Sequence, residues 1–459
     1  MERLTAQDLS MLWPDDVGWP QDIGALVILD GNSLLGRDGR VLIDAVRDAI
    51  ESRLHLVPRF RQRLYLPHWG LGWPLWVDAP AFDIAKHVNI VPVPAPGDEA
   101  QLLHVIEQLR RQPLDRSRPL WQMWFLPGLS DGRVGLYVRV HHAIADGVAG
   151  VAILGAILDA APRPPVKRAP PWRPAPPPST GALLRDNLRR RRTELARALS
   201  SLAHPVTTAR RVRAAWPAVH ETIAAERAPR TSINRPIGPG RRFVMVRSRL
   251  DLVRQVARAH DAKINDVLAA AVAGGLRDLL HSRGERVDDV VLRAYVPVSL
   301  HREQPGQARG NLDGMMAVPL PIGVPDPVFR LRLIAAETAE RRKRPRPAGG
   351  TLLRGRLVQR ALLGLMSHQR WANAYIANVP GPTGPLYFAG APVVEMFPVV
   401  PLLGNITLGV GALSYADQFN ITTVADLDEC PDVEVFVQGM RDALGSLVGS
   451  QLRSTTAAR

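Results

Sequence analysis

The chain has 459 residues, of which 46% are hydrophobic, enough apolar material for two domains with cores of their own. Its formal net charge of +15 favours a polyanionic partner, such as an anionic membrane surface or a phosphate-bearing co-substrate. Aromatic residues make up only 5% and no nucleic-acid-binding motif is present, so we expect no nucleic-acid partner. The single cysteine, Cys430, excludes an internal disulfide and a multi-cysteine metal site.

The N-terminus lacks the basic segment and apolar run of a secretory signal peptide, and no stretch reaches about 18 uninterrupted apolar residues. The most apolar tract, residues 393–413, is interrupted by glutamate, proline, glycine and asparagine. We therefore expect a cytoplasmic protein, with peripheral attachment to the inner face of the plasma membrane or to lipid bodies as a further option.

The first predicted elements follow a β-α-β order up to residue 161. Their hydrophobic periodicity predicts strands at 24–29 and 134–140, and helices at 41–54, 100–112 and 147–160. We interpret residues 1–161 as an N-terminal lobe.

A proline-rich stretch at 162–178 follows and cannot form a regular helix or sheet, so it predicts an extended linker. Beyond it, residues 183–225 carry apolar residues at helical spacing beside many arginines, which predicts one or two basic helices. These helices could lie on an anionic membrane, or they could bridge two lobes with a solvated basic face. Together the linker and helices form a predicted middle segment, residues 162–235.

The C-terminal part, residues 236–459, repeats the mixture of strands and helices. We predict strands at 243–250, 290–298 and 314–321, and helices at 252–260 and 264–281. The basic run at 341–344 precedes two prolines and predicts an exposed loop. The pattern favours an α/β fold of two related lobes, with the active site in a cleft or tunnel between them.

Residues 141–147 read His-His-Ala-Ile-Ala-Asp-Gly and lie where a predicted strand meets a predicted helix. An imidazole titrates near neutral pH, so a histidine here could take a proton from a hydroxyl group. Neighbouring strand residues point to opposite faces, so His141 and His142 would not readily share a metal ion, and we expect no metal. A serine nucleophile at Ser130, within Gly-Leu-Ser-Asp-Gly, is disfavoured because a polar turn, rather than a strand, surrounds it.

Several further landmarks occur in a fixed order along the chain. They are Leu-Thr-Ala-Gln-Asp at 4–8, Pro-Arg-Phe-Arg at 58–61, Pro-Leu-Trp at 119–121, Ile-Asn-Asp at 264–266, Val-Pro-Val-Ser at 296–299 and Asn-Val-Pro-Gly-Pro at 378–382. With the two histidines, they make nearly the whole chain resemble the bacterial wax ester synthase/diacylglycerol acyltransferase family. That family belongs to the His-His-x-x-x-Asp-Gly acyltransferase superfamily, which includes chloramphenicol acetyltransferases and peptide-synthetase condensation domains.

The resemblance implies two chloramphenicol-acetyltransferase-like lobes and transfer of a long-chain acyl group from acyl-CoA to diacylglycerol, giving triacylglycerol, or to a fatty alcohol, giving a wax ester. Acyl-CoA would be a co-substrate, and no cofactor is expected. His142 would be the general base, acting without an acyl-enzyme. His141, Asp146 and Gly147 would form a supporting loop, with Asp146 paired to an arginine and Gly147 allowing a close approach or a special backbone angle.

Asn265 has two interpretations. Asn265 and Asp266 begin the predicted helix 264–281, where such residues cap exposed amide groups. The resemblance instead implies that Asn265 orders the loop or donates to the developing oxyanion. Two other functions remain open: acyl transfer to a polyketide or glycolipid hydroxyl, and a catalytically weak paralogue that binds lipid. The presence of every expected site residue argues against the second of these.

Overall fold

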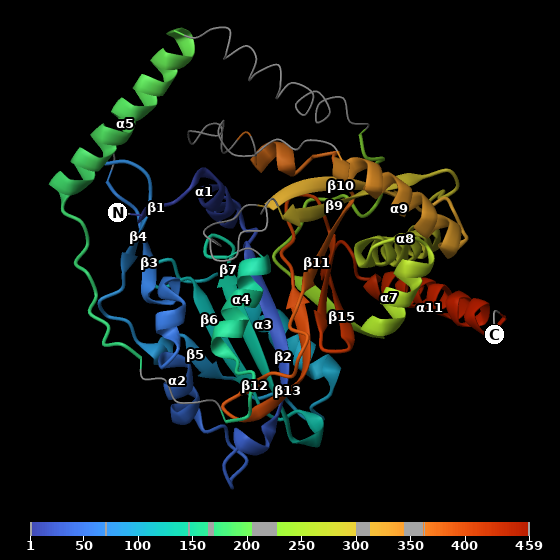
Figure 1. Ribbon diagram of the computed structural model, residues 1–459, viewed down its shortest axis with the longest axis horizontal. Coiled ribbons are helices and arrows are strands. Elements are labelled where there is room, and N and C mark those ends of the chain that lie inside the picture. Colours follow the sequence, from blue (N-terminus) through green and yellow to red (C-terminus); the bar gives the residue numbers. More distant parts are fainter. Residues whose placement is uncertain are drawn as a thin grey trace.

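Two six-stranded sheets form the framework of the protein, and Figure 1 shows them next to each other. The computed structural model describes residues 2–68, 71–145, 147–163, 169–203, 227–299, 313–343, 361 and 363–457. The first sheet has the order β12-β13-β2-β7-β6-β5: Tyr387–Phe388, Ala391–Val399, Asp22–Asp30, Arg133–His141, Trp121–Leu126 and Val88–Ile90. The second has the order β10-β9-β11-β14-β15-β8: Asp313–Pro321, Val291–Ser299, Ala374–Pro380, Leu408–Tyr415, Gln418–Asp426 and Arg241–Arg249.

A small sheet of β1 (Glu2–Arg3), β4 (Leu75–Asp78) and β3 (Gln62–Tyr65) lies beside the first large sheet. The α-helices are α1 (Ala6–Leu12), α2 (Ile43–Glu51), α3 (Glu99–Arg111), α4 (Gly147–Ile157), α5 (Thr180–Ala203), α7 (Leu250–Ala259), α8 (Ile264–Ser282), α9 (Pro327–Lys343) and α11 (Val433–Ala457). Short 3₁₀ turns occur at Pro14–Val17, Gly31–Ser33, Leu54–Leu56, Pro58–Arg61, Ile84–Lys86 and Ser130–Gly132. No helix within the described ranges is long and apolar enough to cross a membrane.

The first sheet contains a strand from the second half of the chain. β13 comes late in the chain, yet it pairs antiparallel with β2 of the first sheet, where Phe397 lies opposite Leu26. The preceding strand β12 pairs with β13 and extends the same sheet edge. Residues 387–399 thus belong to the first sheet by hydrogen bonding, although they lie within the C-terminal part of the chain, residues 236–459.

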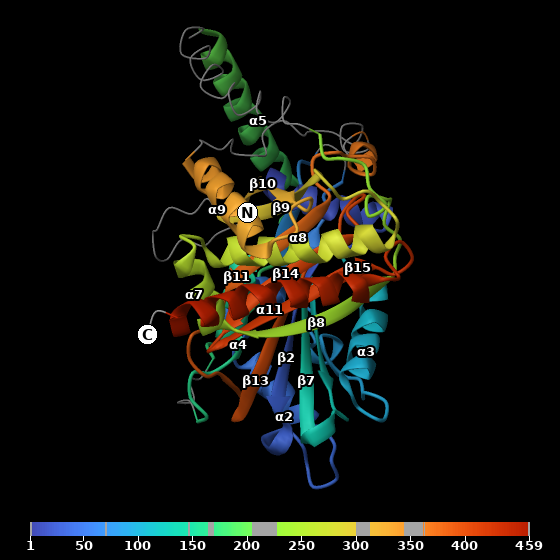
Figure 2. The same cartoon turned by 90° about the vertical axis from the view of Figure 1, so that its right-hand side faces the viewer.

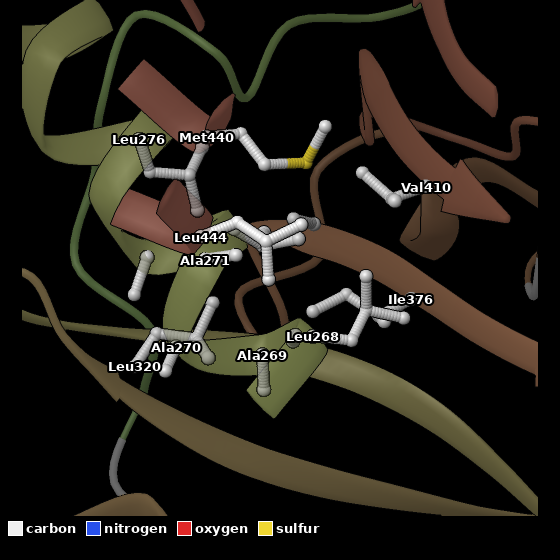
Figure 3. Close-up of a cluster of buried hydrophobic side chains, with 14 of the residues drawn as sticks. Leu268, Ala269, Ala270, Ala271, Leu276, Leu320, Ile376, Val410, Met440 and Leu444 are labelled. Carbon is white, nitrogen blue, oxygen red and sulfur yellow. The ribbon is translucent and has the colours of Figure 1, made fainter. Parts of the chain in front are cut away.

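Helices α8 and α11 form the core of the second lobe, packed on its sheet (Figures 2 and 3). Helix α8 is apolar on nearly every side and carries small residues at 269–275, as expected for a helix buried between a sheet and another helix. A Cβ atom on Gly275 would lie 2.3 Å from the carbonyl oxygen of Phe436, so only glycine allows α8 and α11 to approach this closely. Leu268, Ile376 and Val410 join the helix pair to the strands (Figure 3).

The structure confirms the predicted α/β fold with two lobes, and the helices and strands predicted in the two lobes lie within a few residues of their predicted positions. The prediction of an exposed loop at 341–344 is wrong for its first three residues, which form the last turn of α9. Ion pairs from Arg341 to Glu337 and from Arg342 to Asp266 stabilise that turn. Arg344 lies outside the described residues, as do 204–225 of the predicted basic helices, whose first part is α5.

Candidate active site

Strand β7 places alternate side chains in two different environments. Val138, Val140 and the next residue in this period, His142, line a cavity, whereas Arg139 and His141 point into the polar interior. This separation follows from the period of two in a β-strand. The two histidines therefore face different surroundings, and no group of three or more His, Cys, Asp or Glu in the described part of the chain could hold a metal ion.

Arg139 and Asp22 form a fully buried ion pair beneath the histidines. The Arg139 Nε and Nη2 atoms lie 2.8 and 2.5 Å from Oδ2 of Asp22, and Nη1 donates to the carbonyl oxygen of Gln112 at 2.6 Å. Asp22 lies directly opposite His141 in the β2–β7 ladder. Because a buried charge needs both a counter-ion and hydrogen bonds, this pair fixes the end of β7 in one arrangement.

His141 is buried and held through both ring nitrogens. Its Nδ1 atom accepts the backbone N–H of Ala143 at 3.0 Å, and its Nε2 atom lies 3.0 Å from Oδ2 of Asp15. Since Nδ1 accepts, Nε2 carries the proton and donates to Asp15. His141 thus orients the turn that follows β7.

Asp15 also connects His141 to His142. Burial alone would raise the pKa of Asp15, but hydrogen bonds from His141 and from the backbone N–H of Gln21, with the charge of Arg116, hold that pKa below its usual value. The carbonyl oxygen of Gln21 in turn accepts the backbone N–H of His142 at 2.8 Å. One carboxylate therefore stabilises both the side chain of the first histidine and the peptide that holds the second.

The cavity has a volume of about 320 Å³ and lies where the two sheets meet. His142, Gly147 and Asn265 all line it, so the structure brings these three predicted site residues together. Most of the remaining lining is apolar and comes from both lobes: Ile23 and Ala25 of β2, Val148, Val151, Ile153 and Leu154 of α4, Val379 of β11, Val399 of β13 and Leu413 of β14. The half-buried imidazole of His142 is thus presented to a largely hydrophobic space.

Gly147 begins α4, the helix that contacts β2 of one sheet and β11 of the other. A Cβ atom at this position would lie 3.1 Å from Cγ2 of Val379, tighter than an ordinary van der Waals contact. Its φ is not in the left-handed region. Of the two predicted reasons for glycine here, the geometry supports the close approach and not the special backbone angle.

Asn265 bonds to Asn378 across the cavity wall. The Asn378 Nδ2 atom donates to Oδ1 of Asn265 at 2.6 Å. The capping contact at the start of α8 is made by Asp266, whose Oδ2 accepts the backbone N–H of Lys263 at 2.8 Å. Capping therefore explains Asp266, whereas Asn265 lines the cavity.

Asp146, the remaining predicted site residue, lies outside the described residues. Two residues outside the quoted motifs, Asp15 and Gln21, also shape the site, as does Asn378, the first residue of one landmark. Asp15 is 126 positions from His141, and no local pattern marks such a contact. Asn378 belongs to β11, whose end lines the cavity.

Comparison with known proteins identifies the family of the chain. Residues 4–268 match the wax ester synthase/diacylglycerol acyltransferase catalytic domain, and residues 309–448 match the C-terminal domain of the same family. The chain belongs to the wax ester synthase/diacylglycerol acyltransferase family. It is an acyltransferase and takes an acyl donor and an acyl acceptor, as the sequence predicted.

Among relatives of this family member, a probable diacylglycerol O-acyltransferase of Mycobacterium tuberculosis is 32% identical over 470 residues, covering 100% of this chain and 98% of the relative. A Mycobacterium bovis relative has the same identity and coverage. Among solved structures, the Marinobacter aquaeolei VT8 wax ester synthase/diacylglycerol acyltransferase gives a TM-score of 0.70 at 23% identity, covering 98% of this chain and 99% of that one. A rhizomide synthetase starter condensation domain gives 0.61 at 15% identity, covering 98% and 94%. These structures share the two-lobed fold.

Proposed function

We propose that this acyltransferase moves a long-chain acyl group from acyl-CoA directly to the hydroxyl of diacylglycerol, of a fatty alcohol, or of both. The observation that carries the proposal is the position of His142, the one imidazole lining the cavity between the lobes in the described part of the chain. The names of the mycobacterial relatives support diacylglycerol as acceptor. The apolar walls suit an acyl chain, since transfer of such a chain from water is favourable.

In the proposed reaction, His142 removes the acceptor's hydroxyl proton as that oxygen attacks the thioester carbonyl carbon. A carbon–oxygen bond forms and the carbonyl oxygen becomes negatively charged. The side-chain oxygen of Asn265 accepts a hydrogen bond from Asn378, which leaves the side-chain NH₂ of Asn265 to donate to this oxyanion. The carbon–sulfur bond then breaks, and the CoA thiolate takes the proton from His142. No acyl-enzyme and no further cofactor enter this scheme.

His141, Gly147 and Asp146 keep supporting roles in the proposal. His141 donates to Asp15 and accepts the backbone N–H of Ala143, so it links Asp15 to the turn that carries His142. We further propose a cytoplasmic enzyme that reaches its lipid substrates at a membrane or lipid-body surface, because both acceptors partition out of water.

The test is an ester-forming assay with labelled palmitoyl-CoA and either dioleoylglycerol or hexadecanol. His142→Gln should lower kcat by about 10²–10⁴, while His281→Gln, which changes an exposed histidine on α8, should not. Ester formation that survives His142→Gln would disprove the general-base role. No turnover of either acceptor by the wild type would instead favour a different hydroxyl substrate or a lipid-binding protein.

A further inference from the structure

Helix α5 contacts the body of the protein through residues in its first two turns. Leu183, in its first turn, is buried against Leu75 and Val77 of β4. In the next turn, Oδ2 of Asp186 lies 2.6 Å from Nε of Arg3. Figures 1 and 2 both show the remainder of the helix projecting away from the two large sheets.

Helix α5 carries a stripe of solvent-exposed apolar side chains that begins at its anchored end. Leu184, Leu188, Leu195 and Leu199 are 55%, 48%, 61% and 57% exposed. Their spacings of four, seven and four residues place all four within about 60° of helix circumference, at 3.6 residues per turn. Four exposed leucines aligned this way are not the usual surface of a water-facing helix, which directs its apolar stripe to a core.

Arginines border the leucine stripe on both sides. At about 100° per residue, Arg191 and Arg192 lie about 20° beyond its two edges and Arg185 about 40° beyond one, whereas Arg190 lies on the opposite face. Arg185 and residues 189–192, all arginine, are exposed on α5. The acidic residues on the described helix are Asp186, which pairs with Arg3 and Arg190, and Glu194. The aliphatic part of an arginine side chain can lie along an apolar surface while its guanidinium group stays in a polar environment. The arginines and the leucine stripe can therefore bind the same partner surface.

We propose that α5 docks the enzyme on an anionic lipid surface, with the leucines inserted at the boundary of head groups and acyl chains and the arginines on the lipid phosphates. A helix with an apolar face bordered by arginine is matched by that surface in both charge and polarity. The anchor on β4 joins the docked helix to the small sheet of β1, β4 and β3. This inference concerns binding and is independent of the proposed reaction.

The experiment measures flotation of the full-length protein with phosphatidylcholine vesicles that contain either no phosphatidylglycerol or 30 mol%, a composition of about one anionic lipid in three. Wild-type protein should float only with the anionic vesicles, and raised salt should weaken that binding. Arg191→Gln/Arg192→Gln should bind about 30-fold more weakly, because each basic residue near such a surface adds roughly a fivefold gain in affinity. The matched control Arg254→Gln/Arg258→Gln removes the same charge from exposed positions on α7 and should bind like wild type.

Leu195→Ser/Leu199→Ser should also bind at least about tenfold more weakly, whereas Leu56→Ser/Leu66→Ser, at equally exposed leucines, should not. All these positions are exposed, so circular dichroism and Tm should stay unchanged. Equal flotation of the α5 variants and their controls would overturn the proposal. So would light scattering that shows a wild-type dimer lost in the leucine variant, with vesicle binding intact, since a second copy would then cover the stripe.

Discussion

Oδ2 of Asp15 and Nε2 of His141 meet at 3.0 Å, although the two residues are 126 positions apart. The other carboxylate oxygen, Oδ1, accepts the N–H of Gln21 at 2.9 Å. Both oxygens of Asp15 are therefore acceptors in the structure that holds the two histidines. We conclude that Asp15 is a positioning residue for His142.

Asp15→Asn should lower kcat by about 100-fold. Asparagine has one side-chain oxygen where the structure uses two as acceptors, so its NH₂ group would face a donor and the contact would be lost. His142 would then shift, and a displacement of about 1 Å in a reacting group lowers the rate by about that factor. Asp16→Asn is the matched control, since Asp16 is exposed and contacts only Arg116 among the ion pairs described. Steady-state kinetics should show the loss in kcat rather than KM, with partial recovery in Asp15→Glu. Equal activity of the two asparagine variants would contradict the positioning role.

Asn265 and Asn378 should act as a unit. Asn265→Ala should lower kcat by about 10²–10³, the usual effect of removing an oxyanion donor. Asn378→Ala should cost less, because it only frees Asn265 to rotate. A double-mutant cycle on kcat should be strongly non-additive, with the double variant no worse than Asn265→Ala. If Asn265→Ala lowers Tm but leaves kcat unchanged, its role is structural.

Two glycines of α4 should respond differently to alanine. Gly147→Ala places a methyl group 3.1 Å from Val379 and should reduce activity by displacing α4 or β11 at the cavity. Gly155→Ala meets no atom within 4 Å and should stabilise the protein by about 0.5–1 kcal/mol, because alanine loses less entropy in a helix. Thermal unfolding and the ester assay on the pair separate the two effects. Full activity in Gly147→Ala would show that the close approach is not required.

His87 should make stability depend on pH. Burial lowers the pKa of His87; of the nearby charges, Arg118 also lowers it, whereas Asp83 and Asp115 raise it. The unfolded chain, with a histidine pKa of about 6.5, therefore binds more protons below that pH than the folded chain does. This contribution to stability is present above about pH 6.5 and is lost as the pH falls.

Urea unfolding at pH 7.5 and 5.5 should show a smaller loss of stability for His87→Gln than for wild type. The His87→Gln variant should be less stable than wild type at both pH values, because it loses the stacking of His87 on Trp121, whose ring centroids are 4.6 Å apart. His281→Gln, at an exposed site, should keep the wild-type pH dependence. An unchanged pH dependence in His87→Gln would assign the effect to other groups.

Local sequence patterns were sufficient for much of the fold and for the centre of the site. The alternation before the histidines predicted β7, and one short motif contains both His142 and Gly147. No local pattern connects Asn265 to that motif, and only the family resemblance implied that it belongs to the same site. Asp15 could not be predicted, since its role depends on a contact made only after folding. The helix-start pattern at 265–266 was ambiguous because both residue types can cap, and only the direction of each side chain separates them.

The pairing of the late strand β13 with the early strand β2 has a consequence for synthesis on the ribosome. Until β13 emerges, the apolar strand β2 is an unpaired edge, and edges of this kind invite pairing with other chains. At ~5–20 residues per second, that interval is on the order of tens of seconds. The lobe that carries His142 therefore completes its sheet only after most of the second lobe has been made, so the two halves mature together rather than one after the other.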